Sequence, residues 1–550
     1  MSPTAALAAL PVELLSLIVQ ELELEDLLNS RVVCKSMYVA SQSRQVWSSF
    51  IRKNLGTTIP PPFFLPKPIQ ECSQAELESS IRRLDADWDL KIPLQMNKIP
   101  IVKEEPTTDR LLGTSFCVIP GGQFVLAGLC DGSVRTVDLS GSLVSTSNVP
   151  ASLLIPPPAT LPVTARAVQV RLAMDYISEE ALGESRESCY LSQFNLATIV
   201  CEDESSSSHV DVWRIHLSRP ETDGTSGVHV IKVGEHLCSY MESPTDYLRG
   251  LSLYGNIIAY SMELESPPTN CIVIVDWHDA DAKKEDDELL RWYIPDSPIK
   301  LQTIHLLPGD HIFVENNMPL ETVAAVYNWR LRCPTSTLPP SRQNLNRIPH
   351  PWSQSLSSSD ISGFAISHPV IMNDTIRLVV PTIEALYFLT IPMDDHDLEA
   401  VQFEEVLATT FSANQSAQSF GNRRAVGIDH TSDGIDIFTA QYRFKEDGIP
   451  KKGYRPTCQR HPYSSDPRES IPYLFFDQFS NRIIQIDEYA SYVVTLPSHA
   501  FHSINPKGTT ETDRTNLRSE VTAETASESG ESGHVEGGAI AGYEQEVADR

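Results

Sequence analysis

The 550-residue chain lacks the sequence patterns that usually identify an enzyme. It has no GxxxxGK[ST] phosphate loop, no GxGxxG fingerprint, no GxSxG nucleophile elbow and no HExxH zinc motif. Its 15 histidines include no close pair at helical spacing with an acidic partner. His209 and His216 flank an expected strand, and their odd spacing places them on opposite faces of it. We therefore expect no catalytic residue, no metal site and no other cofactor.

Long apolar runs and clustered positive charge are also missing. No stretch approaches the roughly 18 apolar residues of a membrane-spanning helix, and the apolar residues 5–10 have no basic leader and are followed at once by Pro11 and Glu13. The formal net charge of -29 argues against general binding to nucleic acid or to anionic membranes. The 10 cysteines include no CxxC pair, which indicates reduced thiols and a cytoplasmic or nuclear location.

Residues 1–7 are expected to be a flexible lead-in. Residues 8–53 carry the first clear apolar pattern of the chain. Pro11 suits the first position of a helix, because its φ is already helical and it has no amide hydrogen to leave unpaired. Leu14, Ile18 and Leu22 follow four residues apart, on one stripe of that helix. Further apolar clusters up to residue 51 predict three short helices in this segment.

A helical segment this small cannot hide all of its leucines from water. An apolar patch that stays exposed usually marks a surface for a partner. The spacing alone leaves two interpretations open: a helical cap packed on the rest of the chain, or a docking surface for another protein.

The order of residues in this segment resembles the F-box. That pattern runs from leucine-proline through an acidic residue, paired leucines, isoleucine and leucine to a second leucine pair, a valine-cysteine-basic triplet and a tryptophan. Two positions differ: Met37, with Tyr38 next to it, stands for the usual aromatic residue, and Val46 stands for the usual leucine. The matching anchors are Leu10-Pro11, Glu13, Leu14-Leu15, Ile18, Leu22, Leu27-Leu28, Val33-Cys34-Lys35 and Trp47.

The resemblance implies an adaptor role of the fungal-like F-box type. F-box proteins dock on the Skp adaptor of an SCF-type cullin-RING ubiquitin ligase, and the rest of each protein holds the substrate. No F-box residue performs chemistry in this role, since a few apolar anchors carry most of the binding energy. The residues implied for adaptor binding are Leu10, Pro11, Leu14, Leu15, Ile18, Leu22, Leu27, Leu28, Val33, Cys34 and Trp47.

Residues 54–99 are expected to form a linker that contains one helix. The run Ile59-Pro60-Pro61-Pro62 stops any preceding helix. Ser73 and Glu76 form a capping-box pattern, which predicts a helix from about residue 74 to about residue 90. This helix can be an ordinary amphipathic helix packed on the next domain. If the F-box resemblance holds, it also sets the distance and angle between adaptor and substrate.

Residues 100–502 change to short apolar runs separated by turn signals, which is typical of an all-β domain. The clearest unit is Phe116–Ile119, a Pro-Gly-Gly turn, Phe124–Ala127, the hairpin turn Asp131-Gly132, and Val134–Leu139. Similar units recur at a spacing of about 55 residues, which favours a β-propeller of about seven weak blades, with six to eight left open. A pair of two-sheet β-sandwiches is the alternative.

The repeated unit resembles a degenerate WD-repeat blade. Its third strand ends in Val137-Asp138, Val212-Trp213 or Asp276-Trp277, where that family has tryptophan-aspartate. Residues 503–550 are Ser, Thr, Glu and Gly with few large apolar side chains, so we expect a disordered acidic tail. The fold class is therefore α plus all-β: an F-box, a linking helix, a propeller and a tail.

One segment, residues 443–461, is locally positive in this acidic chain. It contains six basic residues and only two acidic ones, Glu446 and Asp447. Arginine forks pair well with phosphate and carboxylate, so the segment is a candidate for binding an acidic or phosphorylated target. A solvated loop between blades is the other interpretation. The basic residues are Arg443, Lys445, Lys451, Lys452, Arg455 and Arg460.

The hypothesis that best fits these patterns is a non-catalytic substrate receptor of an SCF-type ubiquitin ligase, with a Skp-family adaptor, the cullin-RING core and an unknown protein substrate as partners. Two alternatives remain. The chain can be a Skp-binding propeller scaffold that works outside any ligase. It can also be a propeller hydrolase with an unrelated helical cap, because propellers host hydrolases as well.

Overall fold

A computed structural model describes residues 10–57, 59 and 61–85, and most strands and turns between residues 95 and 495. Residues 1–9, 86–94, 100–112, 140–151, 337–351, 443–456 and 496–550 are among the stretches outside the described residues. The expected disordered tail and flexible lead-in therefore lie outside them.

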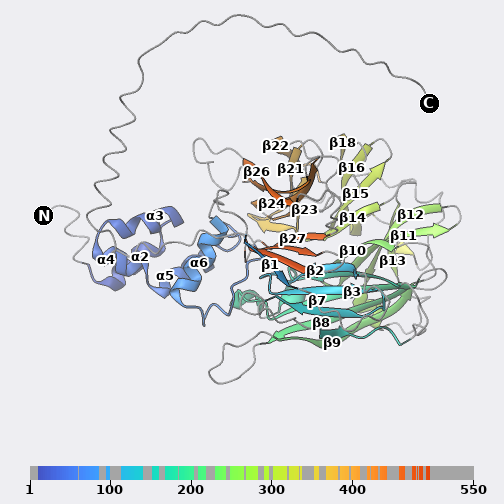
Figure 1. Ribbon diagram of the computed structural model, residues 1–550, viewed down its shortest axis with the longest axis horizontal. Helices are drawn as coiled ribbons and strands as arrows, with labels where there is room; N and C mark the ends of the chain where they lie inside the picture. Colours follow the sequence, from blue (N-terminus) through green and yellow to red (C-terminus); the bar gives the residue numbers. More distant parts are fainter. Residues whose placement is uncertain are drawn as a thin grey trace, which may run out of the picture. The chain divides into compact units, whose positions relative to one another are not determined.

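The N-terminal part consists of short helices, drawn in blue in Figure 1. The segment in which we expected three helices contains five short helical elements, and the chain is extended at Cys34 and at Ser43, the N-caps of the fourth and fifth of these elements. The Cys34 side chain caps the helix that follows by accepting a hydrogen bond from Met37 N at 3.5 Å. The helices are α2 (Val12–Gln20), α3 (Leu24–Asn29), the 3-10 helix η1 (Ser30–Val32), α4 (Lys35–Ser41), α5 (Arg44–Asn54) and α6 (Gln74–Asp85).

These helices share a small apolar core. Leu15 and Val19 of α2 are fully buried, as are Leu27 of α3 and Trp47 of α5. The Trp47 indole Nε1 donates a hydrogen bond to the Ser41 carbonyl at 2.9 Å, which satisfies the one polar atom of the largest core side chain. Leu77 and Ile81 of α6 join the same cluster. The helical segment and the linking helix are therefore one packed unit.

The remaining described residues form seven antiparallel sheets, here called blades 1 to 7 (Figure 1). Blade 1 contains β2 (Gly113–Val118), β3 (Phe124–Leu129), β4 (Val134–Asp138) and β5 (Ser152–Ile155). Blade 2 contains β6 (Val168–Asp175), β7 (Gln193–Glu202), β8 (Ser208–Ser218) and β9 (Val230–Glu242). Blade 3 contains β10 (Leu248–Tyr254), β11 (Ile257–Glu265), β12 (Pro268–Asp276) and β13 (Arg291–Pro295), with β17 (Thr335–Ser336) at its edge.

Blade 4 contains β14 (Leu301–Leu307), β15 (His311–Met318), β16 (Glu321–Asn328) and β18 (Trp352–Ser357). Blade 5 contains β19 (Val370–Met372), β20 (Thr375–Pro381), β21 (Ala385–Pro392) and β22 (Gln402–Ala408). Blade 6 contains β23 (Gln418–Phe420), β24 (Arg424–Thr431), β25 (Gly434–Gln441) and β26 (Thr457–Ser464). Blade 7 contains β27 (Tyr473–Asp477), β28 (Arg482–Ile486), β29 (Ser491–Thr495) and β1 (Gln95–Ile99). Short helices α7 (Glu179–Leu182), α8 (Ser185–Ser188), α9 (Trp277–Ala282) and α10 (Trp329–Arg332) lie in the connections.

The blades are arranged in a ring, since each packs on the next and the last returns to the first. The first strands contact each other in the order β27, β2, β6, β10 and β14, and β23 contacts β27. Apolar clusters fill the spaces between successive blades, and the cluster that closes the ring joins Val125 and Val137 of blade 1 to Ile484 and Ile486 of blade 7. This is the arrangement of a seven-bladed β-propeller, as the sequence predicted. A pair of separate sandwiches does not form such a ring.

One strand lies outside the domain boundary that the sequence suggested. Residues 95–99, which the sequence assigns to the linker, form β1 and pair with β29 from Gln95↔Thr495 to Ile99↔Ser491. β1 is the outermost strand of blade 7. An edge strand needs little apolar surface, so the sequence Gln-Met-Asn-Lys-Ile carries almost no strand signal. The propeller therefore begins at residue 95.

The segment between α5 and α6, residues 55–73, is held by backbone hydrogen bonds on two blades. Asn373 N and Ile371 N of blade 5 donate to the carbonyls of Gly56 and Pro61, at 2.9 and 3.0 Å. At its other end, Leu65 N and Ile69 N donate to the carbonyls of Cys189 and Ser188, at 2.7 and 2.9 Å. Residues 188 and 189 lie between β6 and β7 of blade 2. Blades 2 and 5 are three positions apart in a ring of seven, so this segment crosses one face of the propeller.

The crossing segment is packed as well as hydrogen-bonded. The Phe64 ring meets Tyr176, which follows β6, at a centroid distance of 6.2 Å. Tyr176 in turn meets His368, which precedes β19, at 5.6 Å. A continuous row of rings therefore links the crossing segment to blades 2 and 5.

The capping box at the start of α6 is confirmed and predicts a measurable pH dependence. Ser73 N donates to Glu76 Oε2 at 2.7 Å, and Lys67 Nζ lies 2.7 Å from Glu76 Oε1. Burial alone would raise the pKa of Glu76, but hydrogen bonds from Lys67 and Ser73 and the Lys67 charge lower it to about 2, from an ordinary value of 4.5. Ionised Glu76 therefore stabilises the fold above about pH 4.5, and this contribution is lost as the pH falls toward 2.

We expect Glu76→Gln to lower the free energy of unfolding by about 1 kcal/mol or less at pH 7, because the side chain is partly exposed. Thermal melts of both proteins at neutral pH and near pH 3 measure this difference. It should shrink by more than half at the lower pH. A difference that stays constant would contradict the assigned hydrogen bonds.

Candidate partner-binding surface

One face of α2 leaves large apolar side chains in water. Leu14, Leu17 and Ile18 are 47, 55 and 40% exposed, whereas Leu15 and Val19 on the adjacent face are fully buried. Leu14 and Ile18 are four residues apart and Leu17 is three from Leu14, so the three lie together on the helix. The helix is thus apolar on more of its circumference than its own core requires.

Further exposed apolar residues lie on the elements that pack beside α2. Val32 of η1 and the adjacent Val33 are 87 and 58% exposed, and Val39 of α4 is 49% exposed. α2 contacts α4, and α4 contacts η1. Exposed apolar groups gathered on neighbouring elements usually mark a surface for a protein partner. We call this set the exposed apolar surface; it consists of Val12, Leu14, Leu17, Ile18, Val32, Val33 and Val39.

The residues implied for adaptor binding divide into three groups. Leu15, Leu27 and Trp47 are completely buried, so they form the core beneath the surface and do not contact a partner in this conformation. A sequence match could not separate them from surface anchors, because core and contact leucines obey the same spacing. The exposed ones are Pro11, Leu14, Ile18 and Val33, and the half-buried ones are Leu10, Leu22, Leu28 and Cys34.

Sequence reasoning missed four members of the exposed apolar surface, Val12, Leu17, Val32 and Val39. Leu17 could have been found, since it lies three residues after Leu14. The valines carry no such signal, because isolated apolar residues in a helical segment are more often buried than exposed.

A partly buried ion pair ties this surface to the linking helix. The Arg31 guanidinium binds Glu78 of α6 through two hydrogen bonds, each of 2.8 Å, and both side chains are less than 15% exposed. The same guanidinium donates to Ser41 Oγ at 3.1 Å and lies over the Trp47 ring at 5.8 Å. Arg44 adds hydrogen bonds to the carbonyls of Cys72 and Ile69. The exposed apolar surface is therefore fixed relative to α6 and the crossing segment.

The basic segment proposed for target binding falls mostly outside the described residues, which include neither Arg443, Lys445, Lys451, Lys452 nor Arg455. Arg460 lies in β26, opposite Phe438 of β25. The flanking residues Gln441 and Thr457 pair with each other at the strand end near Arg424, whose Nη2 donates to the Arg83 carbonyl of α6 at 3.0 Å. The described residues that flank the segment thus lie at the face of blade 6 that the linker covers.

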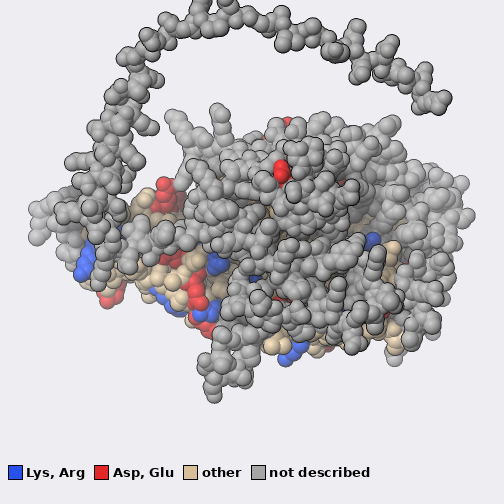
Figure 2. Space-filling model, viewed as in Figure 1, with Lys and Arg blue, Asp and Glu red and all other residues tan. Residues whose placement is uncertain are grey.

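Charge on the helices is mixed, as Figure 2 shows with red and blue atoms close together among uncharged residues. Lys53 pairs with Glu21, and Arg82 pairs with Glu78 at 2.6 Å. Among the described residues, no group of three or more His, Cys, Asp or Glu is placed to hold a metal ion. No helix in the described part of the chain is long and apolar enough to cross a membrane.

Comparison with known proteins supports the F-box resemblance of the N-terminal helices. Residues 7–53 match the F-box-like family. No curated protein matches the chain. Among solved structures, the chain is similar to the Cps50 (Swd1) β-propeller domain of Myceliophteria thermophila, at 11% identity and a TM-score of 0.40, covering 73% of this chain and 99% of that one.

A chain of the mitotic checkpoint complex is similar at 9% identity and a TM-score of 0.35, covering 75% of this chain and 98% of that one. The assignment of the propeller rests on the strand pairing and the closed ring of this chain itself. The protein therefore carries an F-box-like domain at residues 7–53, followed by a β-propeller.

Proposed function

We propose that this protein is the substrate-recognition subunit of an SCF-type ubiquitin ligase. In this proposal the F-box-like domain binds a Skp-family adaptor, and the propeller binds a protein target for the cullin-RING core. The observation that carries the proposal is the exposed apolar surface, because it lies on the same 7–53 segment that matches the F-box-like family. The protein acts without a catalytic residue of its own, in the cytoplasm or the nucleus.

The energetics of the surface support a protein partner. Burying a fully exposed leucine or isoleucine side chain contributes about 1.5–3 kcal/mol. Leu14, Leu17 and Ile18 are each about half exposed, so the three together offer a partner a few kcal/mol before the surrounding valines are counted. That is the scale of the few anchors that dominate a protein interface.

The contacts of the linker support a positioning role. The Arg31–Glu78 pair and the backbone bonds of residues 55–73 join the F-box-like domain to blades 2 and 5. A receptor that holds its target at a fixed distance from a reactive group raises the effective concentration of that target. The crossing segment occupies one propeller face, so we propose that the target binds the opposite face.

The test is to purify the full-length chain with a Skp-family adaptor and a cullin and to measure complex formation by size-exclusion chromatography with light scattering. Co-elution, together with ubiquitylation of a bound protein that depends on this chain, is the expected result. Adaptor binding without ubiquitylation would favour the scaffold alternative. Failure of the full-length chain to bind the adaptor would overturn the proposal.

A further inference from the structure

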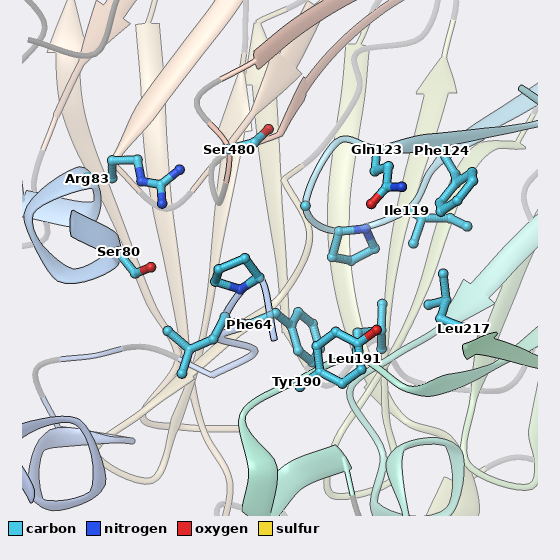
Figure 3. A pocket seen from close by; sticks show the side chains of 14 residues that line it. Phe64, Ser80, Arg83, Ile119, Gln123, Phe124, Tyr190, Leu191, Leu217 and Ser480 are labelled. Atoms are coloured by element: carbon cyan, nitrogen blue, oxygen red, sulfur yellow. The ribbon is translucent and has the colours of Figure 1, made fainter. Parts of the chain in front are cut away.

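A pocket of about 160 Å³ lies where α6, the crossing segment and three blades meet (Figure 3). α6 contributes Ser80 and Arg83, and the crossing segment contributes Phe64, Leu65 and Pro66. The β2–β3 turn of blade 1 contributes Gln123, and Ser480 comes from the β27–β28 turn of blade 7. The volume is close to that of one amino-acid side chain, so this pocket takes a small group.

Arg83 gives the pocket its charge. Its guanidinium points into the pocket in Figure 3, and its Nε donates to the Ser79 carbonyl at 3.3 Å. Arg83 forms no ion pair within 4 Å with another described residue; Asp477 is near enough to favour its charged form, and Arg482 is near enough to oppose it. Burial lowers the pKa of Arg83, and an arginine lowered from 12.5 still carries its charge at neutral pH. The nitrogens at its tip are left to bind an anion.

Gln123 supplies a second polar group at the other side of the pocket. Its side-chain amide points inward in Figure 3 and makes no hydrogen bond to another described residue. Its backbone carbonyl, in contrast, accepts from Leu139 N at 2.7 Å, which fixes the turn. The lining between the two polar groups includes the apolar side chains of Phe64, Phe124 and Leu191.

We infer that this pocket binds a single acidic residue, with the carboxylate on Arg83, the aliphatic part against the apolar lining and a peptide group on Gln123. A planar guanidinium matches a carboxylate through two parallel hydrogen bonds. A phosphate is less suitable, because Arg83 is the only cation among the described lining residues, so one negative charge matches it better than two. The inference does not depend on the proposed adaptor role.

Three small probes test it on the full-length chain alone, by saturation-transfer NMR titration. N-acetyl-glutamate methylamide carries the acid and the peptide groups, and N-acetyl-glutamine methylamide replaces only the charge. Isovalerate carries an acid without a peptide group. A ligand of this size binds at about millimolar Kd. The glutamate probe should bind at least about tenfold more tightly than the glutamine probe.

Arg83→Gln should raise the Kd of the glutamate probe by about tenfold or more. The matched variant Arg82→Gln should leave that Kd within about twofold of the parent value. Arg82 is the neighbouring arginine of α6 but does not line the pocket. Gln123→Ala keeps the backbone hydrogen bond from Leu139 N. It should weaken binding of the glutamate probe and leave binding of isovalerate unchanged. Thermal melts check that each variant is folded.

Binding of isovalerate as well as the glutamate probe would identify a general carboxylate site, and binding of the glutamate probe alone would identify a peptide site. Both support a carboxylate pocket. Equal binding of the glutamate and glutamine probes, no binding of any probe at several millimolar, or equal effects of Arg83→Gln and Arg82→Gln would overturn it.

Discussion

Glutamates in place of both Leu14 and Ile18 should abolish binding of a Skp-family adaptor to the full-length chain. Both side chains are 40% exposed or more, so the substitutions place charge in water and leave the free protein folded. On binding, the same two carboxylates would be buried in an apolar contact, which costs several kcal/mol. Because 1.4 kcal/mol is a factor of ten in Kd, we expect a loss of at least a thousandfold.

The matched control is Gln42→Glu with Gln45→Glu, which adds two charges at exposed polar positions of the same domain. It should bind the adaptor normally in a pull-down and in a titration. Melting temperatures of both double variants should lie within a few degrees of the parent. Adaptor binding that survives in the Leu14 and Ile18 variant, with normal melting, would show that the contact lies on another face.

The largest expected effect on stability belongs to Asp175 at the end of β6. Its carboxylate is 1% exposed and accepts hydrogen bonds from Ile177 N at 2.9 Å, Ser178 N at 3.0 Å and Gly255 N at 2.7 Å, as well as from the Ser178 hydroxyl. Gly255 lies between β10 and β11 of blade 3, so this side chain joins two blades. Asp175→Ala would leave several buried donors without an acceptor.

We expect Asp175→Ala to lower the free energy of unfolding by about 3 kcal/mol. The value is smaller than the sum of four bonds, because burial raises the pKa of Asp175 and so offsets part of their contribution. Denaturant unfolding measures the change. Asp394→Ala, at an exposed turn residue, is the control and should stay within about 0.5 kcal/mol. A similar loss in both variants would refute the linking role of Asp175.

The sequence predicts those parts of this protein that depend on local side-chain pattern. The Ser73–Glu76 capping box and the Asp131-Gly132 turn form where the pattern placed them, and the apolar units form the strands of the blades. Pro11 lies one position earlier than predicted, because it is the extended N-cap of α2, which begins at Val12. Gly132 has a φ of +83°, which is the left-handed geometry that such a turn requires. Each of these features is decided within a few residues, so a single sequence is enough to find it.

The features that the sequence missed depend on contacts between distant residues. The Arg31–Glu78 pair joins positions 47 residues apart, and the crossing segment is held by backbone groups that leave no trace in side-chain pattern. Leu15 and Leu14 look alike in sequence, yet only one is exposed, because the packing of α4 and α5 decides which face of α2 is covered. The candidate site could therefore be located from sequence, but which of its apolar residues are exposed and which are buried could not.

The pairing of β1 with β29 has a consequence for how the protein is made. Gln95 leaves the ribosome long before Thr495, its partner 400 residues later in the chain. At synthesis rates of about 5–20 residues per second, the interval is roughly 20–80 s. Throughout it, β1 has an unpaired edge and blade 7 does not exist. The nascent chain therefore remains open to wrong strand pairing until its last blade has emerged, and protection by chaperones is most needed in that interval.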